Sequence, residues 1–106
     1  MYTVDFNKPI KVHFIGIGGI SMSGLAEILL EAGFEVSGSD RAKSALTQRL
    51  EEEGAVIYYG QRAENIGNDI GLVVYTAAIR ADNQEYAEAA RIGIPMLTRA
   101  ELPGPY

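Results

Sequence analysis

The sequence predicts an α/β fold, namely a Rossmann-like, doubly wound, parallel sheet of five strands in the order 3-2-1-4-5. Three observations support this. Short apolar runs alternate with segments of helical period along the whole chain. A cluster of glycines joins the first apolar run to the first helical segment. The fourth apolar run, "GLVVYT", is continuously hydrophobic, as a central parallel strand should be.

The first strand and the first helix meet across the glycines. The run "KVHFIGI" at residues 11–17 predicts a buried strand. Apolar residues then recur at helical spacing over residues 20–32, and Gly33 can adopt the left-handed conformation that ends a helix. A second strand is predicted at residues 34–39, with Asp40 just past its end.

The remaining elements follow the same alternation. A helix is expected over residues 44–53, with Ser44 as its N-cap and Gly54 as its stop. The later elements are a strand at 55–60, a short helical turn within 61–70, a strand at 71–76, a helix ending near Ile92 and a strand at 95–98. Either Asp82 or Asn83 can cap the last helix, and Glu85 would complete a capping box if Asp82 is the cap.

Composition narrows the classes of function. A chain of 106 residues suits one domain, and its net charge of −5 with scattered basic residues argues against a nucleic-acid partner. The absence of cysteine excludes disulfides, zinc thiolate sites and a cysteine nucleophile. The chain shows neither a signal peptide nor an apolar run long enough to span a bilayer, so we expect a cytoplasmic protein with no membrane partner.

The glycine cluster predicts a site for a phosphate-bearing nucleotide. In this strand order the chain reverses between strands one and four, and ligands bind there, beyond the carboxyl ends of the strands. The spacing of Gly16, Gly18 and Ser21 matches the dinucleotide fingerprint at two of its three glycines. Gly18 and Gly19 carry no Cβ, and amides at a helix start favour a diphosphate. The alternative is that these glycines only permit a tight turn and close helix packing.

Two further residues have open interpretations. Asp40 lies about where a dinucleotide fold places an acidic residue on a ribose hydroxyl, but it can equally be a strand-end or helix-capping residue. His13 is the only histidine, and it is interpreted as a structural residue of the first strand because no nucleophile pattern accompanies it. No catalytic residue and no metal site is predicted.

The stretches "HFIGIGGISMSGLAEILLEAGFEVSGSD" and "VVYTAAIRADNQEYAEAARIGIPMLTRAEL" resemble the N-terminal domain of the Mur ligases, and most closely the branch that adds L-alanine. The resemblance implies that residues 1–102 bind UDP-N-acetylmuramate and that residues 103–106 begin a linker to an ATP-binding central domain. The implied substrate-binding residues are Gly16 at the turn out of the strand, Gly18, Gly19, Ile20 and Ser21 for the diphosphate, Ser39, Asp40, Thr76, Ala77 and Ala78 around the uridine, and Arg99 and Glu101 at the rim.

The sequence departs from the family pattern in informative places. The family usually has glycine at the position of Ser21 and a serine pair at Thr76 and Ala77. Its ATP-binding loop contains a Gly-Lys pair, and no such pair occurs here. The resemblance therefore implies no cofactor for these residues alone, and ATP with magnesium, together with central and C-terminal domains, for a full-length ligase. An isolated chain would bind nucleotide sugar without catalysing ligation.

Other functions stay open at this stage. The glycine spacing and Asp40 also suit an NAD-binding domain of a dehydrogenase or a regulatory sensor. A scaffolding module whose glycines form only a turn is a second alternative. Within the family, the ligase that recycles murein tripeptide is the third.

Overall fold

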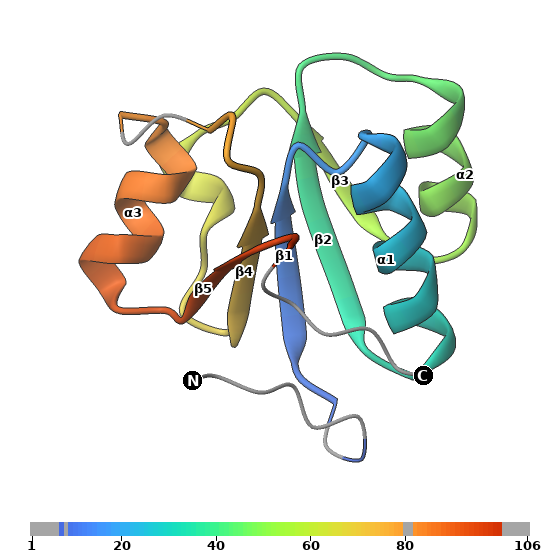
Figure 1. Ribbon diagram of the computed structural model, residues 1–106, viewed down its shortest axis with the longest axis horizontal. Helices are drawn as coiled ribbons and strands as arrows, with labels where there is room; N and C mark the ends of the chain where they lie inside the picture. The colour runs from blue at the N-terminus through green and yellow to red at the C-terminus, as the bar shows by residue number, and fades with distance from the viewer. Residues whose placement is uncertain (1–6, 8, 80–81, 101–106) are drawn as a thin grey trace.

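The computed structural model contains a parallel five-stranded sheet in the order β3-β2-β1-β4-β5 (Figure 1). It describes residue 7, residues 9–79 and residues 82–100. The strands are β1 (Lys11–Ile15), β2 (Glu35–Asp40), β3 (Val56–Tyr59), β4 (Leu72–Tyr75) and β5 (Met96–Thr98). All neighbouring strands pair in parallel, so the predicted fold class and strand order are confirmed.

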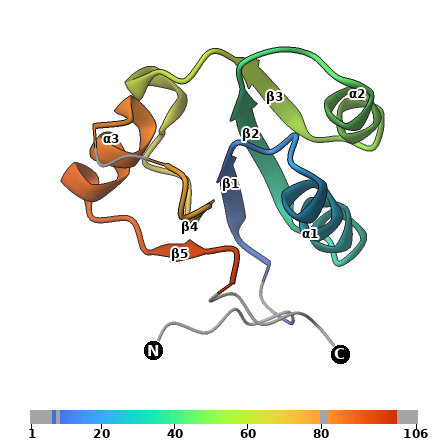
Figure 2. The same cartoon turned by 45° about the horizontal axis from the view of Figure 1, so that its top comes forward.

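Helices cover both faces of the sheet, as a doubly wound fold requires (Figure 2). On one face lie α1 (Ile20–Glu31) and α2 (Ala45–Glu52), which contact each other and the strands β2 and β3. On the other face lie α3 (Gln84–Ile92) and the single 3₁₀ turn η1 (Ala63–Asn65), which pack together. The turn η1 falls inside the polar segment where a short helical turn was predicted. Within the described residues, no helix is long and apolar enough to cross a membrane.

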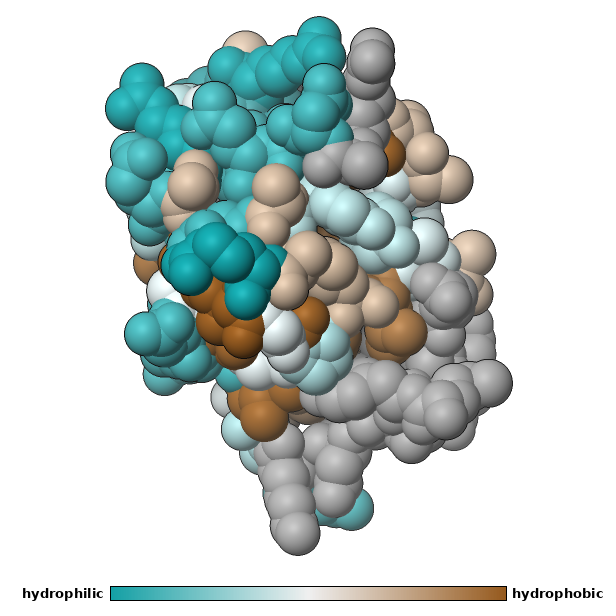
Figure 3. Space-filling view, turned by 90° about the vertical axis from the view of Figure 1, so that its left-hand side faces the viewer, coloured by the Kyte–Doolittle hydropathy of each residue, from teal (hydrophilic) through white to brown (hydrophobic). Residues whose placement is uncertain are grey.

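Alternation along the strands divides the interior into two hydrophobic clusters, because successive side chains point to opposite faces. Val12, Phe14 and Val74 belong to the larger cluster, which lies beneath α1. Ile15 and Val73 belong to the smaller cluster, which lies beneath α3. Figure 3 views the molecule from the α3 side and shows hydrophobic residues in the middle of that face, below a hydrophilic upper part. The larger core thus anchors β1 and α1, the elements on either side of the glycines.

The helix caps are residues that the sequence predicts for these positions. Ser44 caps α2 and forms a capping box with Thr47. Asn83 caps α3, with its side chain accepting from the amides of Glu85 and Tyr86. Glu85 does not complete a capping box, because its carboxylate turns into the protein interior. Gly93 ends α3 in the left-handed conformation, at φ 91°.

Most element boundaries agree with the prediction to within two residues. β1 ends at Ile15 rather than at Ile17, because Gly16 takes a positive φ of 83° and turns the chain. β2 extends through Asp40, which pairs with Tyr59 of β3. The proposed linker at 103–106 lies outside the described residues.

Candidate functional site

The turn between β1 and α1 lies at the carboxyl edge of the sheet, next to the end of β2 (Figure 1). The amides of Gly16 and Ile17 both donate to the carbonyl oxygen of Ser39 at 2.9 Å. Within the turn, the Gly19 amide donates to the Gly16 carbonyl at 3.3 Å. The glycine turn, defined here as residues 16–19, is therefore tied to the last residues of β2.

Gly18 packs closely against the side chain of Asp40. Its amide donates to Oδ2 of Asp40 at 2.8 Å. A Cβ added to Gly18 would stand 2.5 Å from that same oxygen and 3.2 Å from Cγ2 of Thr47. Glycine is thus needed here because a carboxylate packs on it. The expectation that the Gly18 amide is free for a diphosphate needs a correction, since in this structure Asp40 occupies it.

The first turn of α1 is open. Gly19 is its N-cap and provides no side-chain hydrogen bond, and the first turn holds no acidic residue. No described residue accepts a hydrogen bond from the amides of Ile20, Ser21 or Met22. Unpaired amides and the helix dipole together make such a terminus attractive to an anion. These amides stand at the reversal of strand order between β1 and β4.

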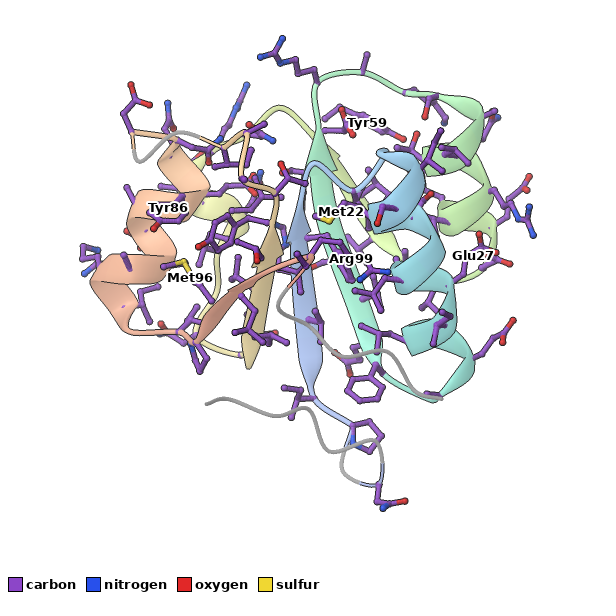
Figure 4. All side chains as sticks on the ribbon, in the orientation of Figure 1. Met22, Glu27, Tyr59, Tyr86, Met96 and Arg99 are labelled. Atoms are coloured by element: carbon purple, nitrogen blue, oxygen red, sulfur yellow. The ribbon has the colours of Figure 1, made fainter. Side chains whose placement is uncertain are left out.

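Arg99 adds a positive charge beside this helix. It follows β5, and its amide donates to the carbonyl of Tyr75 at 2.8 Å. Its Nε donates to the carbonyl of Ser21 at 3.3 Å. In Figure 4 the side chain lies between the end of β5 and α1. The structure thereby brings Arg99 to the first turn of α1.

The other predicted site residues divide into those at the edge and those elsewhere. Ala77 and Ala78 are exposed just past the end of β4, in a turn closed by a 3.0 Å hydrogen bond from the Ile79 amide to the Thr76 carbonyl. Ser39 is fully buried, and its hydroxyl donates to Glu85 at 2.8 Å, so its side chain faces away from the edge. Glu101 lies outside the described residues.

A buried network of polar side chains, not predicted from the sequence, lies beneath the site. The carboxylate of Glu85 is fully buried and accepts from Ser39, from Nε2 of His13 at 2.7 Å and from Nδ2 of Asn65 at 2.7 Å. Nδ1 of His13 lies 2.8 Å from the hydroxyl of Ser37. The structural interpretation of His13 is therefore confirmed. The missed signal was alternation, because His13 and Ser37 are register partners and Ser39 follows on the same face.

Hydrogen bonds keep Glu85 ionised in this buried place. Burial by itself would raise the pKa of the Glu85 carboxyl, but the hydrogen bonds from His13 and Asn65 outweigh that effect. The pKa therefore lies below its ordinary value. An ionised carboxylate can only accept hydrogen bonds, and its two oxygens have enough lone pairs for all of the donors around it.

A separate groove of about 430 Å³ lies near the amino ends of the strands. Its lining consists of Pro9, Ile10, Lys11, Gly33, Glu35 and Asp69. None of the predicted site residues lines it. The candidate site is therefore the open carboxyl edge around the glycine turn, not this groove.

Known proteins match the chain closely. The sequence model of the Mur ligase family, catalytic domain, matches residues 11–104. The UDP-N-acetylmuramate–L-alanine ligase of Agathobacter rectalis is 64% identical over 104 residues, which are 98% of this chain and 23% of that protein. The chain thus spans about a quarter of the length of this relative.

Solved structures agree with the sequence matches. The UDP-N-acetylmuramate–alanine ligase of Thermotoga maritima superposes with a TM-score of 0.81 at 35% identity, covering 86% of this chain and 21% of that one. The UDP-N-acetylmuramate:L-alanyl-γ-D-glutamyl-meso-diaminopimelate ligase of Neisseria meningitides superposes with a TM-score of 0.78 at 31% identity, covering 87% and 29% respectively. On the match over residues 11–104 and these similarities, the chain belongs to the Mur ligase family.

Proposed function

We propose that this chain binds UDP-N-acetylmuramate and forms the nucleotide-sugar-binding part of a UDP-N-acetylmuramate–L-alanine ligase. The observation that carries the proposal is the open first turn of α1 at the sheet reversal, with Arg99 beside it. The relative that is 64% identical carries the name of this ligase. An anionic ligand is compatible with the net charge of −5, because backbone amides and one arginine supply the local positive field.

The proposed placement of the ligand follows from which groups are open. The diphosphate lies at the open amides of Ile20 and Ser21, with Arg99 at the rim. The Gly19 amide joins them if its 3.3 Å hydrogen bond to the Gly16 carbonyl opens. The Gly18 amide joins them only if the Asp40 carboxylate moves away from it, since the two are hydrogen-bonded at 2.8 Å. Whether or not it stays hydrogen-bonded to the Gly18 amide, the Asp40 carboxylate can accept a hydrogen bond from a ribose hydroxyl.

The uridine is proposed to lie toward the turn after β4. Thr76, Ala77 and Ala78 border it, and Glu101, which lies outside the described residues, stays a predicted rim residue. Ser39 contributes through its backbone, because its hydroxyl is engaged by Glu85. Gly16 serves by shaping the turn at its positive φ of 83°.

The complete reaction is proposed for a longer protein, since this chain spans 23% of its relative. ATP with magnesium would activate the substrate carboxylate as an acyl phosphate, and the amine of alanine would then attack it. Those steps need phosphate and metal ligands from central and C-terminal domains. The chain described here would contribute binding and orientation of the substrate. Cytoplasmic location stays a prediction.

Calorimetric titration tests the ligand assignment. The 106-residue chain is titrated with UDP-N-acetylmuramate and, separately, with NAD. We expect a saturable heat with the nucleotide sugar and none with NAD. Saturable binding of NAD alone would instead favour a dinucleotide-binding domain, and binding of neither would favour a scaffolding module. The match to the Mur ligase family favours the first outcome.

The tripeptide-recycling ligase is distinguished by a ligation assay of the full-length protein. The Neisseria structure shows that its fold is shared at 31% identity, so the domain fold alone does not separate the two ligases. Both would bind UDP-N-acetylmuramate through this domain. In the full-length protein, ligation of L-alanine rather than of a tripeptide supports the alanine-adding assignment.

A further inference from the structure

The end of β2 sets the shape of the glycine turn. Both the Gly16 and the Ile17 amides donate to the carbonyl of Ser39, and the Gly18 amide donates to the Asp40 carboxylate. Any movement of Ser39 therefore changes the direction in which the following amides point. Because α1 begins directly after this turn, the position of its first amides depends on the same residue.

Ser39 is in turn held from the opposite face of the sheet. Its hydroxyl donates to Oε1 of Glu85, the same oxygen that accepts from His13. The other oxygen, Oε2, accepts from the Asn65 side chain at 2.7 Å and from the Arg62 amide at 3.2 Å. Both carboxylate oxygens are thus fixed by donors from β1, β2 and the segment containing η1. A charged acceptor that is buried and fully partnered in this way is rigid.

We propose that Glu85 is a positioning residue for the phosphate-binding turn, acting through Ser39. The inference rests on the proposed function for the identity of the ligand. The role of Glu85 in holding the turn can be tested in the free protein. Glu85 belongs to the first turn of α3, on one face of the sheet, whereas the amides it orients open α1 on the other face. The path between them is short: the Glu85 carboxylate, the Ser39 hydroxyl, the Ser39 carbonyl, and the Gly16 and Ile17 amides.

The chain offers a matched pair of variants on β2. Ser37 and Ser39 are both buried, and both hydroxyls belong to the network around His13 and Glu85. Only the Ser39 carbonyl accepts from the glycine turn. Ser39→Ala and Ser37→Ala therefore remove the same chemical group from the same environment, and they differ in their connection to the site.

The first measurement uses the free protein. Amide hydrogen exchange at Gly16 and Ile17 is followed in the wild type and in both variants. We expect Ser39→Ala to speed exchange at these amides, and Ser37→Ala to leave it near the wild-type rate. Equal effects of the two variants would show that the network supports the sheet in general, and would overturn the inference.

The second measurement is affinity for UDP-N-acetylmuramate. We expect Ser39→Ala to weaken binding by roughly threefold to tenfold, the size expected when one supporting hydrogen bond is lost, while Ser37→Ala binds as the wild type does. In the Ser39→Ala background, adding Glu85→Gln should cause no further loss, because the link is already broken. A further loss would assign Glu85 a different route to the site and overturn the inference.

The experiments distinguish failure of the proposed function from failure of the positioning role of Glu85. If the wild type does not bind the nucleotide sugar, the proposed function is wrong, and the exchange rates alone decide whether Glu85 holds the turn through Ser39. If the wild type binds but both serine variants bind equally well, the function stands and the positioning role falls. If Glu85→Gln does not fold, the comparison of the serine variants still decides.

Discussion

Gly18 has neighbours that leave no room for a side chain. A Cβ would meet Oδ2 of Asp40 at 2.5 Å, whereas one on Gly24, in the middle of α1, would meet nothing within 4 Å. The two glycines are close in sequence, and they differ in what an added methyl group would do. Gly18 is constrained by tertiary contact, and Gly24 is not.

We predict that Gly18→Ala displaces the Asp40 carboxylate and costs about 1–3 kcal/mol in the free energy of unfolding, with weaker binding of UDP-N-acetylmuramate. The matched control Gly24→Ala should stabilise the chain by about 0.5–1 kcal/mol, because alanine favours a helix interior. Urea unfolding measures the free energy of unfolding of both variants, and calorimetric titration measures their affinity for UDP-N-acetylmuramate. Equal stabilities of the two variants would mean that Asp40 does not pack on Gly18.

Arg99 is the charged residue that the structure places beside the first turn of α1. We predict that Arg99→Gln weakens binding of UDP-N-acetylmuramate by roughly tenfold, because a charge-assisted contact to the diphosphate is lost. Arg91→Gln removes the same charge at the far end of α3, where Arg91 pairs with Glu88, and should leave the affinity unchanged. The same loss in both variants would indicate a general charge effect and no contact by Arg99.

At the scale of elements, the start of α3 depends on Asn83. Its Oδ1 accepts from the amides of Glu85 and Tyr86, at 3.0 and 3.2 Å, and its Nδ2 donates to Gln61. We predict that Asn83→Ala lowers the free energy of unfolding by about 1 kcal/mol, and that Asn83→Asp, which keeps an accepting oxygen, recovers most of it. Urea unfolding of both variants checks this. An aspartate variant as unstable as the alanine variant would show that the bond to Gln61, not the cap, matters.

The elements could be predicted from the sequence because each is locally marked. Apolar runs bounded by glycine or proline identified the strands, and Ser44 and Gly93 marked a helix start and a helix end. The exact end of β1 was missed because it depends on the backbone angle of Gly16. The site was predicted less completely. The glycine turn is a local pattern, but the contact of Gly18 with Asp40 and the inward turn of Ser39 depend on residues that only the folded sheet brings together.

At the scale of the whole molecule, Glu85 of α3 joins the neighbouring strands β1 and β2 to η1. Its pKa is lower in the folded protein than the ordinary value of 4.5. Ionised Glu85 therefore stabilises the fold above about pH 4.5, and this contribution is lost as the pH falls through the folded-state pKa. The carboxyl groups of the exposed Asp69 and the half-buried Glu88 also have lowered pKa values, so the pH dependence of the wild type alone does not isolate Glu85.

Comparison with Glu85→Gln isolates it. We predict that this variant is less stable than the wild type by about 1–3 kcal/mol at pH 7, because buried donors lose a charged acceptor. The difference should shrink as the pH falls below about 4.5, since the wild-type carboxylate becomes neutral as well. Urea unfolding at a series of pH values measures both. A constant difference between pH 7 and pH 3 would contradict a lowered pKa of Glu85 in the folded state.

Binding of an anionic nucleotide sugar by this acidic chain can be located through the chemical shifts of its backbone amides. The isotope-labelled 106-residue chain is titrated with UDP-N-acetylmuramate while the backbone amides are followed by NMR. We predict that the largest shifts fall on Ile20, Ser21 and Met22, whose amides are open at the start of α1, and on the adjacent Gly19. Saturable binding that leaves these amides unmoved and shifts residues elsewhere would contradict it.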